Sequence, residues 1–203
     1  MVQSFGPINH IDNMPSIEIT EENGLKKLNA IKTDKSRGPD QLPSRVLFEV
    51  RNENVAPLTL LFKLSIETAT HDWKIGEIRV IYKNGSNANV SNYWPVSLTS
   101  VVCKIAELLI RDHIMIHFIS NNLFSSKEFG FIQGRSTVLQ LLHVLDTWVK
   151  NFNEGGQIDV IYTDFAKAFD KVPHCRLISK LCSYGINDRL YGLKISYCIG
   201  VRE

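Results

Sequence analysis

The stretch that follows Gly155-Gly156 limits the fold of this chain most, because it places a helix end, a strand, a turn and a new helix within a few residues. The two glycines are expected to stop one helix, and Pro173 is suited to open the next. The mostly apolar residues 158–163 between them predict a short strand. That strand would end at Asp164, directly before a tight turn.

A carboxylate in this position is suited to holding a metal ion at the mouth of a sheet. The strand fixes the backbone, and the turn lets a hard cation and its phosphates approach the oxygens. By pattern alone, an edge strand with a solvated Asp164 is the alternative. Asp159 precedes Asp164 by five positions, so in a strand it points to the opposite face and is a poor ligand. Asp170 is interpreted as a turn or capping residue.

The first half of the chain is predicted to be mainly helical. Residues 1–15 form a loose lead-in, and Thr20 can cap a helix whose apolar positions are Leu25, Leu28 and Ile31. The segment from Lys35 to Pro43 interrupts that pattern. Residues 44–70 are again helical in pattern, with Pro57 in a first turn or at the end of the preceding piece.

The pattern changes to alternation at Glu77–Lys83, which predicts a strand with Ile78, Val80 and Tyr82 on a buried face. A turn-rich loop follows at residues 84–89. Two further helices are predicted, the second capped by Ser136. The expected buried positions are Val101, Val102, Ile105, Leu108 and Leu109 in the first, and Val138, Leu142, Leu145 and Val149 in the second.

Several helices with few strands indicate an α+β fold. A length of 203 residues is sufficient for one domain or a domain and a half, and the 44% hydrophobic content is ordinary. The net charge of +2 gives no support for nucleic-acid binding. The four cysteines form no C-x-x-C pair and are interpreted as reduced core thiols. Without a signal peptide or a long apolar run, the chain is predicted to be intracellular and not membrane-bound, with nucleus and cytoplasm not distinguished.

Four blocks of sequence occur in an order that matches one known family. They are Lys35–Pro43 (KSRGPDQLP), Asn92–Ser100 (NYWPVSLTS), Phe129–Thr137 (FGFIQGRST) and Ile161–His174 (IYTDFAKAFDKVPH). The last closely resembles the first catalytic motif of reverse transcriptases from jockey-like non-LTR retrotransposons, Tyr-x-Asp-Phe-x-Lys-Ala-Phe-Asp-x-Val-Pro-His. The blocks cover roughly residues 15–200, which makes chance similarity a poor explanation.

The resemblance implies a right-hand RNA-directed DNA polymerase, with residues 16–156 as fingers and 157–203 as the first part of the palm. Its partners would be an RNA template, a DNA primer and deoxynucleotides. Polymerases of this kind are expected to use two Mg²⁺ ions, and Asp164 matches the first of three metal-binding carboxylates. Phe169 matches the aromatic gate beneath the sugar that favours deoxynucleotides, although it can also be a buried anchor of the turn.

Basic side chains would hold the triphosphate and the template. Arg135 lies just before a predicted helix start, where its guanidinium and free backbone N–H groups could meet phosphate; an exposed loop arginine is the equal alternative. Arg79 and Lys83 lie on the strand that the family uses near the incoming nucleotide. Without the resemblance, they would be interpreted as ordinary solvated charges.

This sequence also departs from the family. Trp94 and Ile132 replace arginines, and Phe129 replaces a histidine, which predicts weaker phosphate binding. The Tyr-x-Asp-Asp hairpin with the other two carboxylates does not occur in these residues. We therefore expect a truncated polymerase domain that is inactive by itself. The alternatives are a non-catalytic remnant that binds nucleic acid weakly, or an unrelated α+β domain. We also expect self-association through the unpaired strand at residues 158–163.

Overall fold

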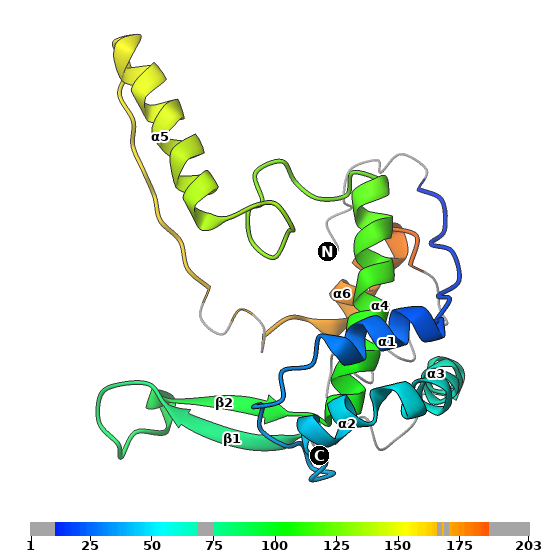
Figure 1. Cartoon of the computed structure of the whole chain (residues 1–203). Coiled ribbons are helices and arrows are strands. Elements are labelled where there is room, and N and C mark those ends of the chain that lie inside the picture. The colour runs from blue at the N-terminus through cyan, green and yellow to red at the C-terminus, as the bar shows by residue number, and fades with distance from the viewer. Residues whose placement is uncertain (1–10, 69–74, 166–167, 169–170, 187–203) are drawn as a thin grey trace. The chain divides into compact units, whose positions relative to one another are not determined.

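The computed structural model describes residues 11–68, 75–165, 168 and 171–186. Figure 1 shows the whole chain, which divides into two compact units. Unit 1 comprises Met1–His117 and Pro173–Glu203, and unit 2 comprises Phe118–Val172. Within the described part, no helix is long and apolar enough to cross a membrane.

Unit 1 begins with helix α1 (Glu21–Asn29), which is capped as predicted. The Asn23 amide donates to the Thr20 hydroxyl at 3.2 Å, which satisfies one of the free N–H groups at the helix start. Acidic residues occupy the first turn and basic residues the last, an order that suits the helix dipole. Leu28 is fully buried. The cap and the apolar spacing together therefore define this helix locally.

Helices α2 (Ser44–Glu49) and α3 (Arg51–Thr68) follow, and here the expectation for Pro57 is wrong. Pro57 lies inside α3, beyond its first turn. Because proline has no N–H, the carbonyl of Glu53 loses its helical partner, at a cost of about 3 kcal/mol. Burial of Phe62, which is 1% exposed, holds the turns beyond the proline and offsets that cost.

Strands β1 (Glu77–Tyr82) and β2 (Tyr93–Leu98) form an antiparallel hairpin, with a short 3₁₀ turn, η2 (Val90–Asn92), before β2. The predicted strand is confirmed, whereas its buried face is wrong. Ile78, Val80 and Tyr82 are 47%, 66% and 45% exposed. The described residues add no third strand, and the hairpin extends away from the helices of its unit, so neither face is fully covered (Figure 1).

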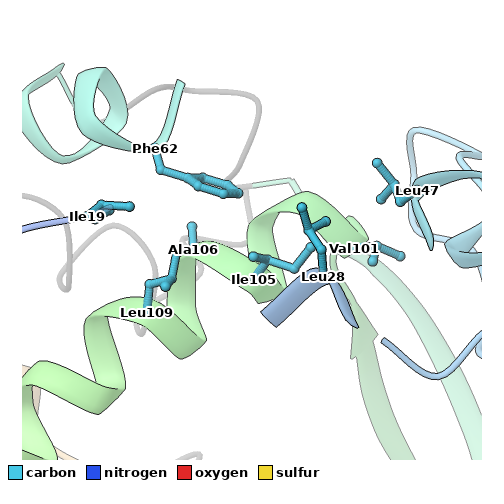
Figure 2. Close-up of a cluster of buried hydrophobic side chains, with 8 residues drawn as sticks. All are labelled: Ile19, Leu28, Leu47, Phe62, Val101, Ile105, Ala106 and Leu109. Atoms are coloured by element: carbon cyan, nitrogen blue, oxygen red, sulfur yellow. The ribbon is translucent and has the colours of Figure 1, made fainter. Parts of the chain in front are cut away.

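Helix α4 (Val101–Ser120) supplies much of the core of unit 1. Val101, Ile105 and Leu109 are buried as predicted; Val102 is half-buried, and Leu108 is 38% exposed. Figure 2 shows the buried cluster, in which side chains from α1, α2, α3 and α4 come together. Its members are Ile19, Leu28, Leu47, Phe62, Val101, Ile105, Ala106 and Leu109. An ion pair between Lys27 and Asp112 also joins α1 to α4.

Helix α6 (His174–Ser183) completes the described part of unit 1, directly after Pro173 as predicted. Its C-terminal end is joined to α4 through the ring of His117, whose Nε2 lies 2.7 Å from the Tyr184 carbonyl oxygen. His117 is only 5% exposed, so this polar contact is made within the unit. Burial with a hydrogen-bond partner is how a protein accommodates such a polar ring.

The main element of unit 2 is helix α5 (Thr137–Asn153), and its two ends are confirmed. The Leu139 amide donates to the Ser136 hydroxyl at 3.3 Å, and Gly155 has a φ of 77° just beyond the helix. The predicted buried stripe is wrong, because Val138, Leu142, Leu145 and Val149 are 49–65% exposed. Apart from the last turn of α4, the described residues of unit 2 contain no other helix or strand to cover that stripe.

The strand predicted to lead to Asp164 is also wrong. Residues 157–165 have no regular secondary structure. No backbone hydrogen bond joins them to another described residue. Ile161 and Tyr162 are 88% and 84% exposed. A β-strand is stabilised by hydrogen bonds to a neighbouring strand. Residues 157–165 have an apolar composition but no such neighbour among the described residues, so the segment is irregular. The described structure as a whole is helix-rich with a two-stranded sheet, which is compatible with an α+β fold.

Candidate functional site

Two of the four sequence blocks meet in unit 1, at the loop Lys35–Pro43. Local hydrogen bonds fold this loop: the Gln41 amide donates to the Gly38 carbonyl at 3.0 Å, and the Leu42 amide donates to the Asp40 carboxylate at 3.2 Å. Gly38 is buried against the end of the second block. A Cβ at this position would lie 2.6 Å from the Ser100 Cα and 2.7 Å from the Thr99 carbonyl oxygen. The close approach of two backbones therefore requires glycine here.

This contact also fixes the base of the hairpin. Ser100 lies two residues beyond β2 and directly before α4, and its hydroxyl accepts a hydrogen bond from the Cys103 amide at 3.0 Å. The loop of the first block thus packs where β2 passes into α4. The base of the hairpin is therefore rigid, because it is held by α4 and by the packed loop.

One face of the hairpin carries the two basic residues predicted to meet nucleotide. Arg79 is opposite Val96 and Ile81 is opposite Trp94, and side chains directly opposite each other share a face. The Lys83 amide donates to the Asn92 carbonyl at 2.8 Å, which continues this register by one pair. Arg79, Ile81 and Lys83 alternate along β1 and its end, so all three lie on this face. We call it the Trp94 face.

The charges on the Trp94 face are open to solvent. The Arg79 guanidinium pairs with the Glu77 carboxylate at 2.7 Å, and their side chains are 67% and 36% exposed. An exposed ion pair contributes only about 0–1 kcal/mol, so a phosphate could displace the carboxylate at little cost. Lys83 is exposed, and in the described part of the chain its ammonium has no recorded ion pair.

The opposite face has a structural task at the hairpin tip. The rings of Tyr82 and Tyr93 contact each other with centroids 5.6 Å apart. The Tyr93 hydroxyl donates to the Asn87 carbonyl at 3.0 Å, and the Tyr82 hydroxyl donates to the Gly85 carbonyl. These bonds hold the tip loop to the strands. The tyrosines are therefore committed to the loop, and the basic side chains Arg79 and Lys83 lie on the Trp94 face.

Arg135 organises the loop before α5 in unit 2. Its Nη1 donates to the carbonyls of Ser125 at 2.8 Å, Ser126 at 3.4 Å and Glu128. Its guanidinium carbon lies 5.8 Å from the centroid of the Phe129 ring. The first role of this arginine is thus to close the loop. Its other guanidinium nitrogens have no partner recorded among the described residues, so they could still meet an anion.

Asp164 lies exposed on the irregular segment of unit 2, and no contact with Arg135 is recorded. Among the described residues, no group of three or more His, Cys, Asp or Glu side chains could hold a metal ion. Asp159 is also exposed. Phe169 and Asp170 lie outside the described residues. The structure therefore brings Arg79 and Lys83 together on one face, and it leaves the proposed roles of Asp164, Phe169 and Arg135 as predictions.

The interpretation of the cysteines as core thiols holds for Cys103 and is wrong for Cys175 and Cys182, which are exposed. Cys198 lies outside the described residues. The Cys103 thiol donates to Glu107 Oε1 at 3.6 Å on the adjacent turn of α4. Burial raises the pKa of Glu107, and the thiol hydrogen bond opposes that rise only in part. Burial also raises the pKa of Cys103. This thiol is therefore a packed and unreactive group.

Sequence reasoning treated Trp94 only as a lost arginine and did not identify β2. The structure places this indole, 64% exposed, opposite Ile81 and between the two basic positions. A signal was present, since Tyr93, Trp94 and Val96 have strand propensity and follow a turn-rich loop. Pro95 concealed it. Because Lys83 and Asn92 are hydrogen-bonded, the pair Val80–Pro95 is of the non-hydrogen-bonded kind, so proline loses no ladder bond there.

Comparison with known proteins gives the chain relatives but no family model, since none matches it. Two curated proteins of Drosophila melanogaster are similar: a "Probable RNA-directed DNA polymerase from transposon BS" and a "Probable RNA-directed DNA polymerase from transposon X-element". Each is 27% identical over 172 residues, which cover 83% of this chain and 19% of the relative. The chain thus spans about a fifth of their length. The resemblance to transposon RNA-directed DNA polymerases is confirmed at the level of sequence.

Proposed function

We propose that this chain contributes nucleic-acid-binding parts of an RNA-directed DNA polymerase of a non-LTR retrotransposon. In this proposal, residues 16–156 correspond to the fingers and residues 157–203 to the start of the palm. The observation that carries it is the ordered set of four sequence blocks within a stretch that is similar to two transposon polymerases. The substrates would be an RNA template, a DNA primer and deoxynucleotides.

The hairpin gives the proposal a physical basis. A polymerase must hold a polyanion that slides, so it needs exposed cations on a rigid element rather than deep charged pockets. Arg79 and Lys83 meet this need on the Trp94 face. The packed loop at Gly38 and the start of α4 at Ser100 hold that element in place.

Metal-ion catalysis needs more carboxylate ligands than the described residues bring together. Mg²⁺ requires several oxygen ligands at near-octahedral positions, and two ions need shared carboxylates. Asp164 is a single exposed carboxylate on an irregular segment. The described residues therefore do not fit a magnesium site by themselves. If Asp164 acts as a ligand, further carboxylates must reach it.

A non-catalytic alternative rests on the same face. A remnant of a retroelement could retain weak, sequence-independent binding to nucleic acid through Arg79, Lys83 and Arg135. Both candidates predict binding, and only the first predicts that Asp164 contributes to nucleotide incorporation when the remaining carboxylates are supplied. The 203-residue chain by itself is expected to extend no primer, because only Asp164 matches one of the three carboxylates of the family.

The binding test uses a labelled RNA–DNA hybrid and a series of salt concentrations. Lys83→Gln should weaken binding equally for different sequences and lower the magnitude of the salt slope by about one. Lys63→Gln on α3 is the matched control, because Lys63 is exposed in the same unit and distant in sequence from the four blocks. An unchanged slope for Lys83→Gln, or an equal change for Lys63→Gln, would remove the hairpin from the proposed interface.

The catalytic test is primer extension on an RNA template with Mg²⁺, with and without Asp164→Ala. No product is expected from the chain alone. Template-dependent product that disappears in Asp164→Ala would show that another carboxylate completes the site, and the expectation of inactivity would then be wrong.

A further inference from the structure

We propose that Trp94 is a stacking platform for an unpaired base of single-stranded nucleic acid, with Arg79 and Lys83 meeting the adjoining phosphates. This inference rests on the proposed nucleic-acid function and adds a residue and a mode of contact to it. It also changes the meaning of a departure from the family. At position 94 the family has an arginine, whose guanidinium can form paired hydrogen bonds with phosphate. The indole would instead bind the nucleic acid by stacking on a base.

Exposure is the first argument. Trp94 is 64% exposed on a two-stranded ribbon, and no hydrogen bond or ring contact is recorded for its indole within the described residues. Both other aromatic rings of the hairpin are committed, since Tyr82 and Tyr93 contact each other and bind the tip loop. Its cross-strand partner Ile81 is 54% exposed, so the indole and this side chain together form an open apolar surface on which a base could lie.

Position is the second argument. Trp94 is opposite Ile81, and Arg79 and Lys83 lie two residues to either side of Ile81 on the same face. A cation thus lies on each side of the ring along the strand direction. An aromatic ring between cations is the arrangement by which single strands are bound without sequence preference, because every base has a face to stack and every nucleotide a phosphate.

Rigidity is the third argument. The tip loop is tied to the strands by the tyrosine hydroxyls and by the Asn92 side-chain amide, which donates to the Ser86 carbonyl at 3.0 Å. Gly85, with a φ of 90°, makes room for that amide, since a Cβ there would lie 2.5 Å from its nitrogen. A platform that is ordered before binding loses little entropy when the base stacks.

Charge complementarity selects the occupant. Apolar residues alone on this face would also suit a protein partner, but cations on both sides of the ring favour a polyanion. Double-stranded nucleic acid hides its base faces in the stack, so it could use only the cations. Single-stranded RNA or DNA uses the cations and the ring together.

The experiment measures binding of the full chain to a fluorescein-labelled single-stranded uridine oligonucleotide by anisotropy. Trp94→Ala should weaken binding by about five- to 150-fold, the range for loss of one stacked base, and leave the salt slope unchanged. Trp94→Phe should retain most of the affinity, which guards against a result caused by misfolding. Val80→Ala is the matched control, because Val80 is 66% exposed on the opposite face.

The outcomes separate the inference from the proposed function. If Trp94→Ala binds as well as the parent while Lys83→Gln binds less well, nucleic-acid binding stands and stacking is refuted. If the oligonucleotide does not bind at all, both fail. If Trp94→Ala alters only the oligomeric state in sedimentation, the ring covers a protein contact and the inference is overturned.

Discussion

Replacing Gly38 by alanine should destabilise unit 1, because the added methyl group meets backbone atoms that belong to the start of α4. The Cβ would lie 2.6 Å from the Ser100 Cα, and ordinary contact begins at 3.4 Å. The loop or the helix start must therefore shift by roughly 0.8 Å, the difference between these distances. A backbone cannot rotate away as the end of a side chain can, so the neighbouring core also has to adjust.

The magnitude follows from two opposing effects. Overpacking of this kind costs about 1–3 kcal/mol. Alanine also restricts the unfolded chain, which returns about 0.4–1 kcal/mol. The net loss in the free energy of unfolding should lie within about 0–2.6 kcal/mol, with a central value of about 1.3 kcal/mol, or roughly 3–5 °C in the melting temperature.

Urea unfolding followed by far-ultraviolet circular dichroism would measure this loss, with Gly130→Ala as the matched control. Gly130 belongs to another of the sequence blocks, and nothing lies within 4 Å of its added Cβ. Its substitution should change stability by no more than about 0.5 kcal/mol. Equal stability of the two variants would refute the conclusion that the first and second blocks are joined by this close contact.

Three other predictions concern the core, an acid and the irregular segment. Leu28→Ala should cost about 2–5 kcal/mol in urea unfolding, because the side chain is fully buried, while Val90→Ala at an 84% exposed position should be nearly neutral. Glu107→Gln should stabilise unit 1 at pH 7. Burial raises the pKa of Glu107 in the folded state, so the ionised form is penalised as the pH rises through and above its ordinary value of 4.5, and the gain should vanish below that value in thermal melts from pH 3 to 8. Amides 158–163 should exchange rapidly with solvent in a verified monomer; strong protection there would mean that the segment has found a partner.

Local signals were sufficient to predict the starts of α1 and α6 and both ends of α5. Thr20 and Ser136 cap α1 and α5 through hydrogen bonds to residues three positions ahead, and Gly155 and Pro173 act on their immediate neighbours. Such contacts depend on a few adjacent residues, so a sequence pattern contains all the information. The strand β1 was predicted for the same reason, from alternation alone.

Predictions that needed a distant partner were the ones that failed. The alternation in β1 correctly identified a strand, but burial of its face depended on an element that the described structure does not place there. The stripe on α5 and the segment before Asp164 failed in the same way, since each is apolar enough to be buried but stays largely exposed in the described structure. Hydrophobic pattern gives the capacity for burial, and only tertiary contacts decide whether it occurs.

The two parts of the proposed function, nucleic-acid binding and metal-dependent nucleotide transfer, also differ in whether they need distant segments of the chain. Binding of a single strand can be local, since one hairpin, held at its base by the Gly38 loop and α4, presents Arg79, Trp94 and Lys83 on one face. Metal-dependent transfer cannot be local, because its carboxylates must converge from separate strands to within the coordination distance of one ion. The segment that presents Asp164 has no ladder to fix it, whereas the hairpin has a complete one. The hairpin therefore already has the element that its proposed role requires, whereas Asp164 needs other segments to fix the irregular segment that carries it.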